Sequence, residues 1–251
     1  MRAFVLALSL ATLPVATVAW SAPPSLSAAV AASTRTPDNV KLDDSRKPAQ
    51  VLRFLGLRPG MQVLDLFGSN KYWSEIIAPA IGPTGHVTVW NPAQFIDDKE
   101  KAAFDEFATR QKNVDLVVSP FEAPNLPRNK FDFAILNNNY HDVYWINDKY
   151  KVVRMDPHAW LMTLNHAMKR GGIVGVIDHV ASPNSDTRAT VDKFHRIDPA
   201  VVRRDFSAAG FALVGASNIL RNPKDDHSLI VFDPKIRGKT DRFIYRFKKV
   251  R

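Results

Sequence analysis

Histidines and carboxylates gather after the ends of two predicted strands, 131–137 and 172–178. A carboxylate beside a histidine orients the imidazole and raises its proton affinity, which suits the pair to removing a proton from a hydroxyl or an amine. The same groups could also ligate a divalent metal through oxygen and nitrogen, although the sequence assigns no particular residue to a metal. The candidate catalytic residues are Tyr140, His141, Asp142, Asp178 and His179.

Further Asp/His pairs lie downstream, and each has a structural as well as a functional interpretation. His195 and Asp198 could join the candidate site, but Asp198 followed by a proline also fits a helix N-cap with proline at the first helical position. The segment 225–227, Asp-Asp-His, could form a lid or a rim. Short Asp-rich segments are also common as turn formers, so the sequence leaves both roles open.

A strand, a tight loop and a helix follow one another between residues 61 and 80. Residues 61–67 are apolar except for Gln62 and Asp65, as expected for a strand buried on both faces. One glycine, Gly68, follows, and a helical apolar pattern then covers 73–80. This order begins a nucleotide-binding α/β fold, in which the first loop brings the backbone close to the ligand.

Helical and strand-like segments alternate along the rest of the chain, which predicts βαβ crossovers and a mostly parallel sheet with helices on both faces. Ligands of such sheets bind beyond the carboxyl ends of the strands. We expect a seven-stranded α/β fold that ends in an antiparallel strand. Strands are expected over 61–67, 86–90, 114–119, 131–137, 172–178, 211–217 and 242–248, and helices over 49–55, 73–80, 97–111, 157–168 and 199–209.

Several motifs resemble those of class I S-adenosylmethionine-dependent methyltransferases. These are the seven strands with a closing hairpin, the segment Leu57-Arg58-Pro59-Gly60-Met61-Gln62-Val63-Leu64-Asp65 and the segment Met168-Lys169-Arg170-Gly171-Gly172. The chain is more closely similar to exported bacterial proteins described as predicted methyltransferases, over about residues 45 to 249. That similarity rests on segments 140–142, 177–179, 195–198, 225–227 and 239–243.

The resemblance implies a Rossmann-like domain that binds S-adenosylmethionine and methylates a small oxygen or nitrogen nucleophile. It places the cofactor at Asp65, Gly68, Ser69 and Asn91, with His141 or His179 as the base and Asp142 and Asp178 orienting it. The sequence departs from the family pattern in two places. The three glycines of Gly-x-Gly-x-Gly are replaced by Phe67, Ser69 and Lys71, and the acid that ends the second strand is replaced by Asn91.

These departures keep two other functions open. The first alternative is a non-catalytic binding protein that has kept the methyltransferase fold and lost the cofactor, because side chains crowd a loop where glycine permits close approach and Lys71 places a positive charge near the expected sulfonium. The second alternative is a metal-dependent enzyme that uses the Asp/His cluster on the same scaffold. Asp142 and Asp178 would then occupy places similar to the carboxylates that hold a metal in some class I O-methyltransferases.

The N-terminus and the composition predict an exported protein. Arg2, an apolar run and Ala19-Trp20-Ser21 fit a signal peptide over residues 1–21, which implies a periplasmic or secreted location. Residues 22–45 are expected to form a flexible linker and 46–251 the methyltransferase-like domain, with no stable membrane span after cleavage. The net charge of +9 suits a small, anionic ligand better than nucleic acid, because the basic residues are scattered. The absence of cysteine excludes disulfides and thiolate chemistry.

Overall fold

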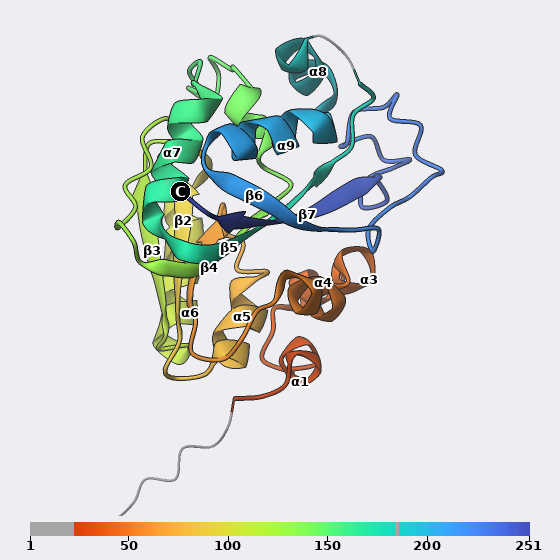
Figure 1. Ribbon diagram of the computed structural model, residues 1–251. Coiled ribbons are helices and arrows are strands. Elements are labelled where there is room, and N and C mark those ends of the chain that lie inside the picture. Colours follow the sequence, from red (N-terminus) through yellow and green to blue (C-terminus); the bar gives the residue numbers. More distant parts are fainter. Residues whose placement is uncertain (1–22, 184–185) are drawn as a thin grey trace, which may run out of the picture.

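The computed structural model describes residues 23–183 and 186–251, so the predicted signal peptide lies outside the described residues. The described chain contains a seven-stranded sheet of order β3-β2-β1-β4-β5-β7-β6 (Figure 1). All strands are parallel except β7, which pairs antiparallel with both β5 and β6. The strands are β1 Gln62–Leu66, β2 His86–Pro92, β3 Val114–Ser119, β4 Phe131–Asn137, β5 Met168–His179, β6 Phe211–Ser217 and β7 Arg242–Lys249.

Helices cover both faces of the sheet, as the alternating sequence pattern predicts. The first face is covered by α7 (Pro157–Ala167), α8 (Thr187–Phe194) and α9 (Pro199–Ala208). The second is covered by α1 (Leu26–Val30), α4 (Pro48–Leu55), α5 (Ser74–Ile81) and α6 (Asp98–Arg110). Residues of β1 alternate between the two apolar cores, Leu64 facing the first and Val63 the second, and both are fully buried. The central strands are therefore fixed by burial on both sides.

The segment 22–45, predicted to be a flexible linker, instead contains α1, α2 (Pro37–Val40) and the start of α3 (Asp43–Arg46). Ser25 caps α1 through a 3.2 Å hydrogen bond from Ala28 N. The buried Arg35 forms a bidentate ion pair with Asp43, with N–O distances of 2.6 and 2.9 Å. Helices this short carry no sustained apolar period, which is why the sequence pattern did not reveal them.

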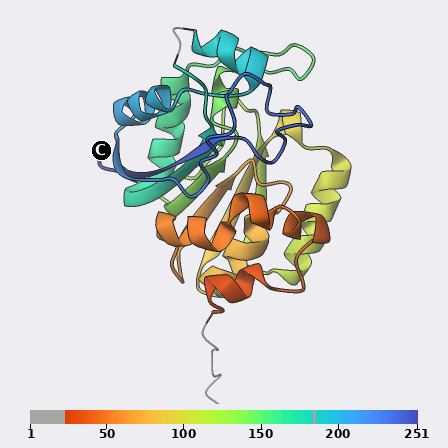
Figure 2. The same ribbon diagram turned by 90° about the vertical axis from the view of Figure 1, so that its right-hand side faces the viewer.

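The connection between β6 and β7, residues 218–241, lies over the carboxyl ends of the parallel strands (Figure 2). Residues at its end, such as Thr240, face the loops that follow β1 and β4 across one cavity. The sheet topology therefore brings distant segments to the edge where α/β folds bind ligands. Among the described residues, we find no helix with the length and apolarity needed to span a bilayer.

Candidate active site

One cavity of about 950 Å³ occupies the carboxyl ends of β1, β2, β4 and β5. The loop after β1 contributes Phe67 and Ser69 to its wall, and the segment after β4 contributes His141 and Asp142. His179, the last residue of β5, completes this part of the wall. The cavity is large enough for a drug-sized cofactor together with a small substrate. The predicted nucleotide loop and the predicted Asp/His centre therefore share one site.

Asp178 holds His141 through two hydrogen bonds. Its Oδ2 accepts the His141 backbone N–H at 2.9 Å, and its Oδ1 lies 2.8 Å from Nδ1 of the ring. Asp178 is fully buried and does not line the cavity, so it acts through His141 and not on a ligand directly. Burial alone would lower the pKa of His141, but Asp178 and Asp142 outweigh it and raise the pKa to about 9. These contacts are those that the predicted orienting role of Asp178 requires, and the role itself stays a prediction.

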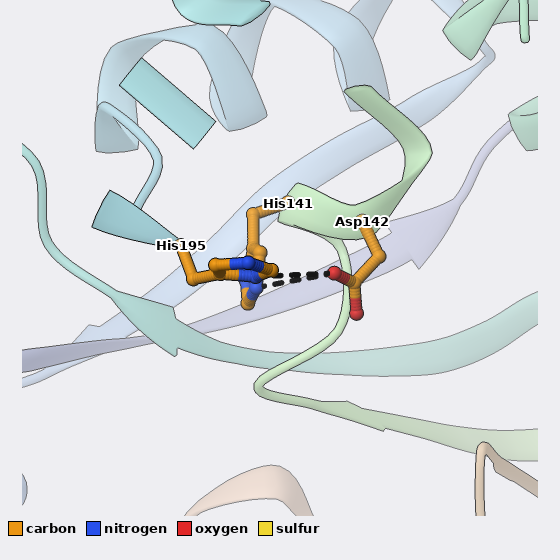
Figure 3. A group of neighbouring side chains, drawn as sticks. All are labelled: His141, Asp142 and His195. Atoms are coloured by element: carbon orange, nitrogen blue, oxygen red, sulfur yellow. Dashed lines mark ion pairs between the residues drawn. The ribbon is translucent and has the colours of Figure 1, made fainter. Parts of the chain in front are cut away.

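Asp142 faces two imidazoles, those of His141 and His195 (Figure 3). Its Oδ1 is 3.3 Å from His141 Nε2 and 3.7 Å from His195 Nδ1, and its Oδ2 accepts a 3.1 Å hydrogen bond from Asn139. Burial would raise the pKa of Asp142, but the two histidines and the Asn139 amide reverse that effect and lower it. The ligand atoms of His141, Asp142 and His195 all lie within 4.8 Å of one another, so these residues could hold a metal.

His195 reaches this group because α8 ends beside it. Residue 195 is the C-cap of α8 and has a left-handed backbone (φ 50°). The sequence analysis did not predict α8, and it left His195 and Asp198 open between a role in the site and a structural role at a helix start. The ring of His195 packs against Trp145 and Phe232, each with a ring-centroid distance of 5.0 Å. These rings make the cavity wall beside the Asp/His group apolar, although Phe232 is 54% exposed.

His179 lines the same cavity but has a different electrostatic environment. Its Nδ1 forms a 2.7 Å hydrogen bond with Thr240 Oγ1, and no carboxylate orients its ring within the described chain. Burial, followed by the nearby His141, Arg242 and other cations, lowers the pKa of His179 well below its usual value. His179 is therefore the neutral imidazole of the site, whereas His141 carries a proton in the absence of a bound ion.

Tyr140, predicted as a catalytic residue, does not face the cavity. Its side chain is fully buried, and its hydroxyl donates a 2.9 Å hydrogen bond to Asp205 of α9. Its ring packs on Phe206 at 5.3 Å. Burial and the adjacent Asp205 carboxylate raise the pKa of Tyr140 well above its usual value. Tyr140 is the N-cap of η2 (His141–Tyr144), and its contacts place it in the core between the sheet and α9.

The loop after β1 keeps glycine-like backbone conformations without glycines. Phe67 and Lys71 occupy the first and third glycine positions of the family pattern, and both are left-handed, with φ of 59° and 65°. Ser69, at the second position and predicted to bind the cofactor, lines the cavity. Lys71 is half-buried but is not part of the cavity wall, so its charge is not directed at a ligand there. The backbone path of the loop persists although its side chains have changed.

Asp65 and Gly68, both predicted to touch a cofactor, contact each other instead. A Cβ on Gly68 would lie 2.6 Å from the Asp65 carboxyl carbon. Asp65 is buried, accepts a 2.6 Å hydrogen bond from Ser74 Oγ, and does not line the cavity. Burial raises the pKa of Asp65 to about 7, although Ser74 and Arg46 oppose the shift. Asp65 and Gly68 therefore shape the loop from the side away from the cavity.

Asn91 lines the cavity, yet both its amide oxygen and its amide nitrogen are hydrogen-bonded within the protein. Its Oδ1 accepts a 3.4 Å hydrogen bond from Ser69 N, and its Nδ2 donates to the carbonyls of Pro92 and Phe95 at 3.2 and 3.1 Å. The residue is only 2% exposed. Asn91 therefore ties the loop after β1 to the loop after β2.

Two arginines that the sequence analysis did not select also line the cavity. Arg46 ends α3 and stacks over Tyr72 at 4.1 Å, and Arg242 begins β7 and donates to the Ser45 carbonyl. Burial and the neighbouring Arg46 lower the pKa of Arg242 to about 10. Across the described ranges, neither guanidinium forms an ion pair with a carboxylate. Arg242 is buried and Arg46 partly buried, and two neighbouring cations that form no direct ion pair favour an anionic ligand.

Two aspartates of the downstream Asp/His segments, Asp225 and Asp198, have structural roles. Asp225 forms a bidentate, fully buried ion pair with Arg196, with N–O distances of 2.9 and 3.0 Å. Asp198 caps α9 by accepting a 2.7 Å hydrogen bond from Ala200 N. The suggested lid or rim role of Asp225 is therefore replaced by a role in holding the connection between β6 and β7.

The overall fold is that of Rossmann-like methyltransferases of known structure. A methyltransferase from Aquifex aeolicus, named as dependent on S-adenosylmethionine, shares 18% identity and a TM-score of 0.57, with 85% of this chain and 100% of that chain covered. The 1,6-didemethyltoxoflavin-N1-methyltransferase from Burkholderia thailandensis, solved with S-adenosylhomocysteine, shares 18% identity and a TM-score of 0.52, covering 85% and 80% of the two chains. The [4+2]-cyclase SpnF matches with 16% identity and a TM-score of 0.59, covering 82% and 80%.

In sequence, no protein-family model matches the chain. A search of curated proteins also finds no match. The comparisons therefore establish the fold, which hosts a cyclase as well as methyltransferases, and the function has to be argued from the site.

Proposed function

We propose that the protein binds S-adenosylmethionine in the 950 Å³ cavity and methylates a small oxygen or nitrogen nucleophile there. The observation that carries this proposal is the shared wall of the cavity. The loop that holds the cofactor in this fold and the Asp/His group lie on one continuous space. A methyl donor and a nucleophile must meet in such an arrangement.

The methionine end of the cofactor fits the residues present. Its carboxylate is an anion, and Arg46 and Arg242 are cations of the cavity wall that form no direct ion pair with a carboxylate of the described residues. Ser69 offers a hydroxyl on the same wall, and the left-handed Phe67 and Lys71 preserve the loop path. The ribose end fits less well, because Asn91 has no free donor and carries no charge. We therefore expect weak binding, with much of the affinity supplied by the arginines.

The cofactor, when bound, supplies an electrophilic methyl group. Of the chain's own groups, His179 is the one placed to accept the proton of the nucleophile, because its imidazole lies on the cavity wall and is neutral, although its lowered pKa makes it a weak base. His141 is held by Asp178 and carries its own proton at neutral pH, so it serves to position and to charge the site. The rings of Trp145 and Phe232 make this end of the cavity apolar and favour a substrate with an apolar body.

A second function deserves a direct test: a non-catalytic protein that binds a small anion in the same cavity. The specific observation in its favour is the full use of the Asn91 amide within the protein. In this alternative the two arginines bind the anion, and no adenosyl group is required.

Titration calorimetry of the purified protein with S-adenosylmethionine and S-adenosylhomocysteine separates the two functions. We expect binding of both, weakened at least tenfold by Arg46→Gln or Arg242→Gln and unchanged by Arg53→Gln, which lies on the exposed side of α4. The absence of heat at millimolar cofactor would refute the methyltransferase proposal. Binding of citrate with the same arginine dependence, and none of the cofactor, would establish the alternative.

Export to the periplasm or the medium is part of this proposal, and only the sequence of residues 1–21 supports it. N-terminal sequencing of the protein from the envelope fraction of a bacterial host should begin at Ala22. A product that begins at Met1 and remains in the cytoplasm would contradict export.

A further inference from the structure

Three side chains at the inner end of the cavity form a ligand set that neither the fold nor the proposed methyl transfer requires. They are His141, Asp142 and His195, in which two imidazoles converge on one carboxylate oxygen (Figure 3). We propose that these residues bind a divalent transition-metal ion of the zinc class.

The spacing of the donor atoms suits such an ion. Asp142 Oδ1 lies 3.3 Å from His141 Nε2 and 3.7 Å from His195 Nδ1, and all ligand atoms lie within 4.8 Å. Zinc binds nitrogen and oxygen at about 2.0–2.2 Å, which places neighbouring tetrahedral ligands roughly 3.4 Å apart. A small movement of His195 would complete the geometry.

The surrounding hydrogen bonds leave Nε2 of His141 and Oδ1 of Asp142 available to coordinate the ion. Asp178 occupies Nδ1 of His141 at 2.8 Å, so Nε2 is the nitrogen that faces Asp142. Asn139 donates to the outer oxygen of Asp142, which fixes the carboxylate and leaves Oδ1 for coordination. Metal-binding histidines and carboxylates in proteins are typically oriented by hydrogen bonds of this kind. Asp178 is thus an orienting residue, whereas the sequence analysis had grouped it with Asp142 as a potential metal ligand.

Burial and ligand type narrow the choice of ion. His141 and Asp142 are 3% and 8% exposed, which distinguishes the group from the solvated acidic clusters common on protein surfaces. Two imidazoles with one carboxylate favour zinc, manganese or iron over calcium and magnesium, which prefer oxygen. Three protein ligands would leave a coordination position open, and all three residues line the cavity. A substrate oxygen or nitrogen could occupy it.

The test is a titration of the chelator-treated, cofactor-free protein with Zn²⁺, Mn²⁺ and Mg²⁺. Binding is measured by calorimetry and by the shift of thermal unfolding. We expect one Zn²⁺ per chain, a higher unfolding temperature with Zn²⁺, and no effect of Mg²⁺. Asp178→Asn should weaken Zn²⁺ binding about 10–100-fold, because it removes the group that orients His141. The visible spectrum of bound Co²⁺ should change in the same variant.

The ligand variant is His195→Asn, because asparagine tolerates the left-handed backbone found there. It should weaken Zn²⁺ binding at least 100-fold. His227→Asn is the matched control, since His227 is also left-handed (φ 65°), partly exposed and hydrogen-bonded to an aspartate, Asp241, but lies outside this group. The control should bind Zn²⁺ as the unaltered protein does.

Equal Zn²⁺ affinity in His195→Asn and the unaltered protein would overturn the proposal, as would an equal loss in both variants. The inference does not depend on S-adenosylmethionine, because the titration contains none. Loss of cofactor binding with retained Zn²⁺ binding would refute only the proposed function, and the converse result would refute only the metal site.

Discussion

Asp178 accepts a hydrogen bond from the backbone N–H of His141 at 2.9 Å and also pairs with its ring at 2.8 Å. One carboxylate thereby fixes both the start of the η2 turn and the orientation of the imidazole. The pairing joins adjacent parallel strands, because His141 follows β4 and Asp178 lies near the end of β5. Because of this contact, the charge of His141 depends on whether the protein is folded, and the stability of the protein should therefore depend on pH.

In metal-free buffer, the His141 contribution to stability should disappear at alkaline pH. The folded-state pKa of about 9 lies above the ordinary value of 6.5, so the folded state binds this proton more tightly than the unfolded state does. The stabilisation is complete below about pH 6.5 and is lost as the pH rises through about 9. Denaturant unfolding of the protein and of Asp178→Asn should show a stability difference that shrinks between about pH 6 and pH 10. A pH-independent difference would contradict the assignment.

The contact between Gly68 and Asp65 predicts a coupled pair of substitutions. Gly68→Ala would place a Cβ 2.6 Å from the Asp65 carboxyl carbon, so it should destabilise the protein by about 1–3 kcal/mol. Asp65→Ala removes the obstructing group and leaves Ser74 without its partner. The double variant should lose less stability than the two single variants added together, as measured by urea unfolding. Additive losses would mean that the loop relieves the contact elsewhere.

The burial of Asp65 predicts a pH effect opposite to that of a paired carboxylate. Burial raises its pKa from 3.8 to about 7, so between these values the unfolded state ionises while the folded state keeps the proton. The folded state therefore loses stability as the pH rises through this window. Asp65→Asn removes the ionisation and should gain on the order of 2 kcal/mol relative to the unaltered protein between about pH 5 and pH 8.

The half-exposed Asp132, which pairs with Lys169, provides the control for that experiment. Asp132→Asn should lose relative stability, or show no change, over the same pH interval. A gain for both variants would point to the net charge of the protein and not to the burial of Asp65.

The strand pattern of this chain could be predicted because burial on both faces leaves a direct sequence signal. The bounds of β3, β4 and β6 agree with the expectations from apolar runs, and the neighbouring positions of β4 and β5 bring His141 and Asp178 together. Whether a neighbouring residue faces the cavity or the core depends on a single turn, and this is why Tyr140 was wrongly placed in the site.

The remaining site residues could not be predicted because they reach the cavity through irregular or short elements. His195 arrives at the end of α8, whose apolar pattern is weak, and its partner Asp142 lies 53 positions earlier in the printed sequence. Arg46 belongs to a short helix in a segment without periodicity. Their positions follow from tertiary packing, which local sequence patterns do not encode.

The left-handed backbone at Lys71 predicts an unusual order of stability among variants at this position. Lys71→Gly should leave stability unchanged or raise it by up to about 1 kcal/mol, whereas Lys71→Val should cost about 1–2 kcal/mol. At Lys99, a helical position of α6, the order should reverse, because glycine is the poorer helix former there. Urea unfolding of the four variants checks this. Cofactor affinity should not change at Lys71, because the residue is not part of the cavity wall.

Placing at position 91 the acid of the class I methyltransferase pattern should not create a cofactor site of that type. Asn91→Asp would place a carboxylate against the carbonyls of Pro92 and Phe95, which now accept hydrogen bonds from the Asn91 amide. The loss of two donors at a position only 2% exposed should cost about 2 kcal/mol or more. We expect lower unfolding temperature and no gain in calorimetric affinity for S-adenosylmethionine. Tighter binding without loss of stability would show that the loops after β1 and β2 rearrange around the ligand, and that position 91 faces the ribose as the sequence predicts.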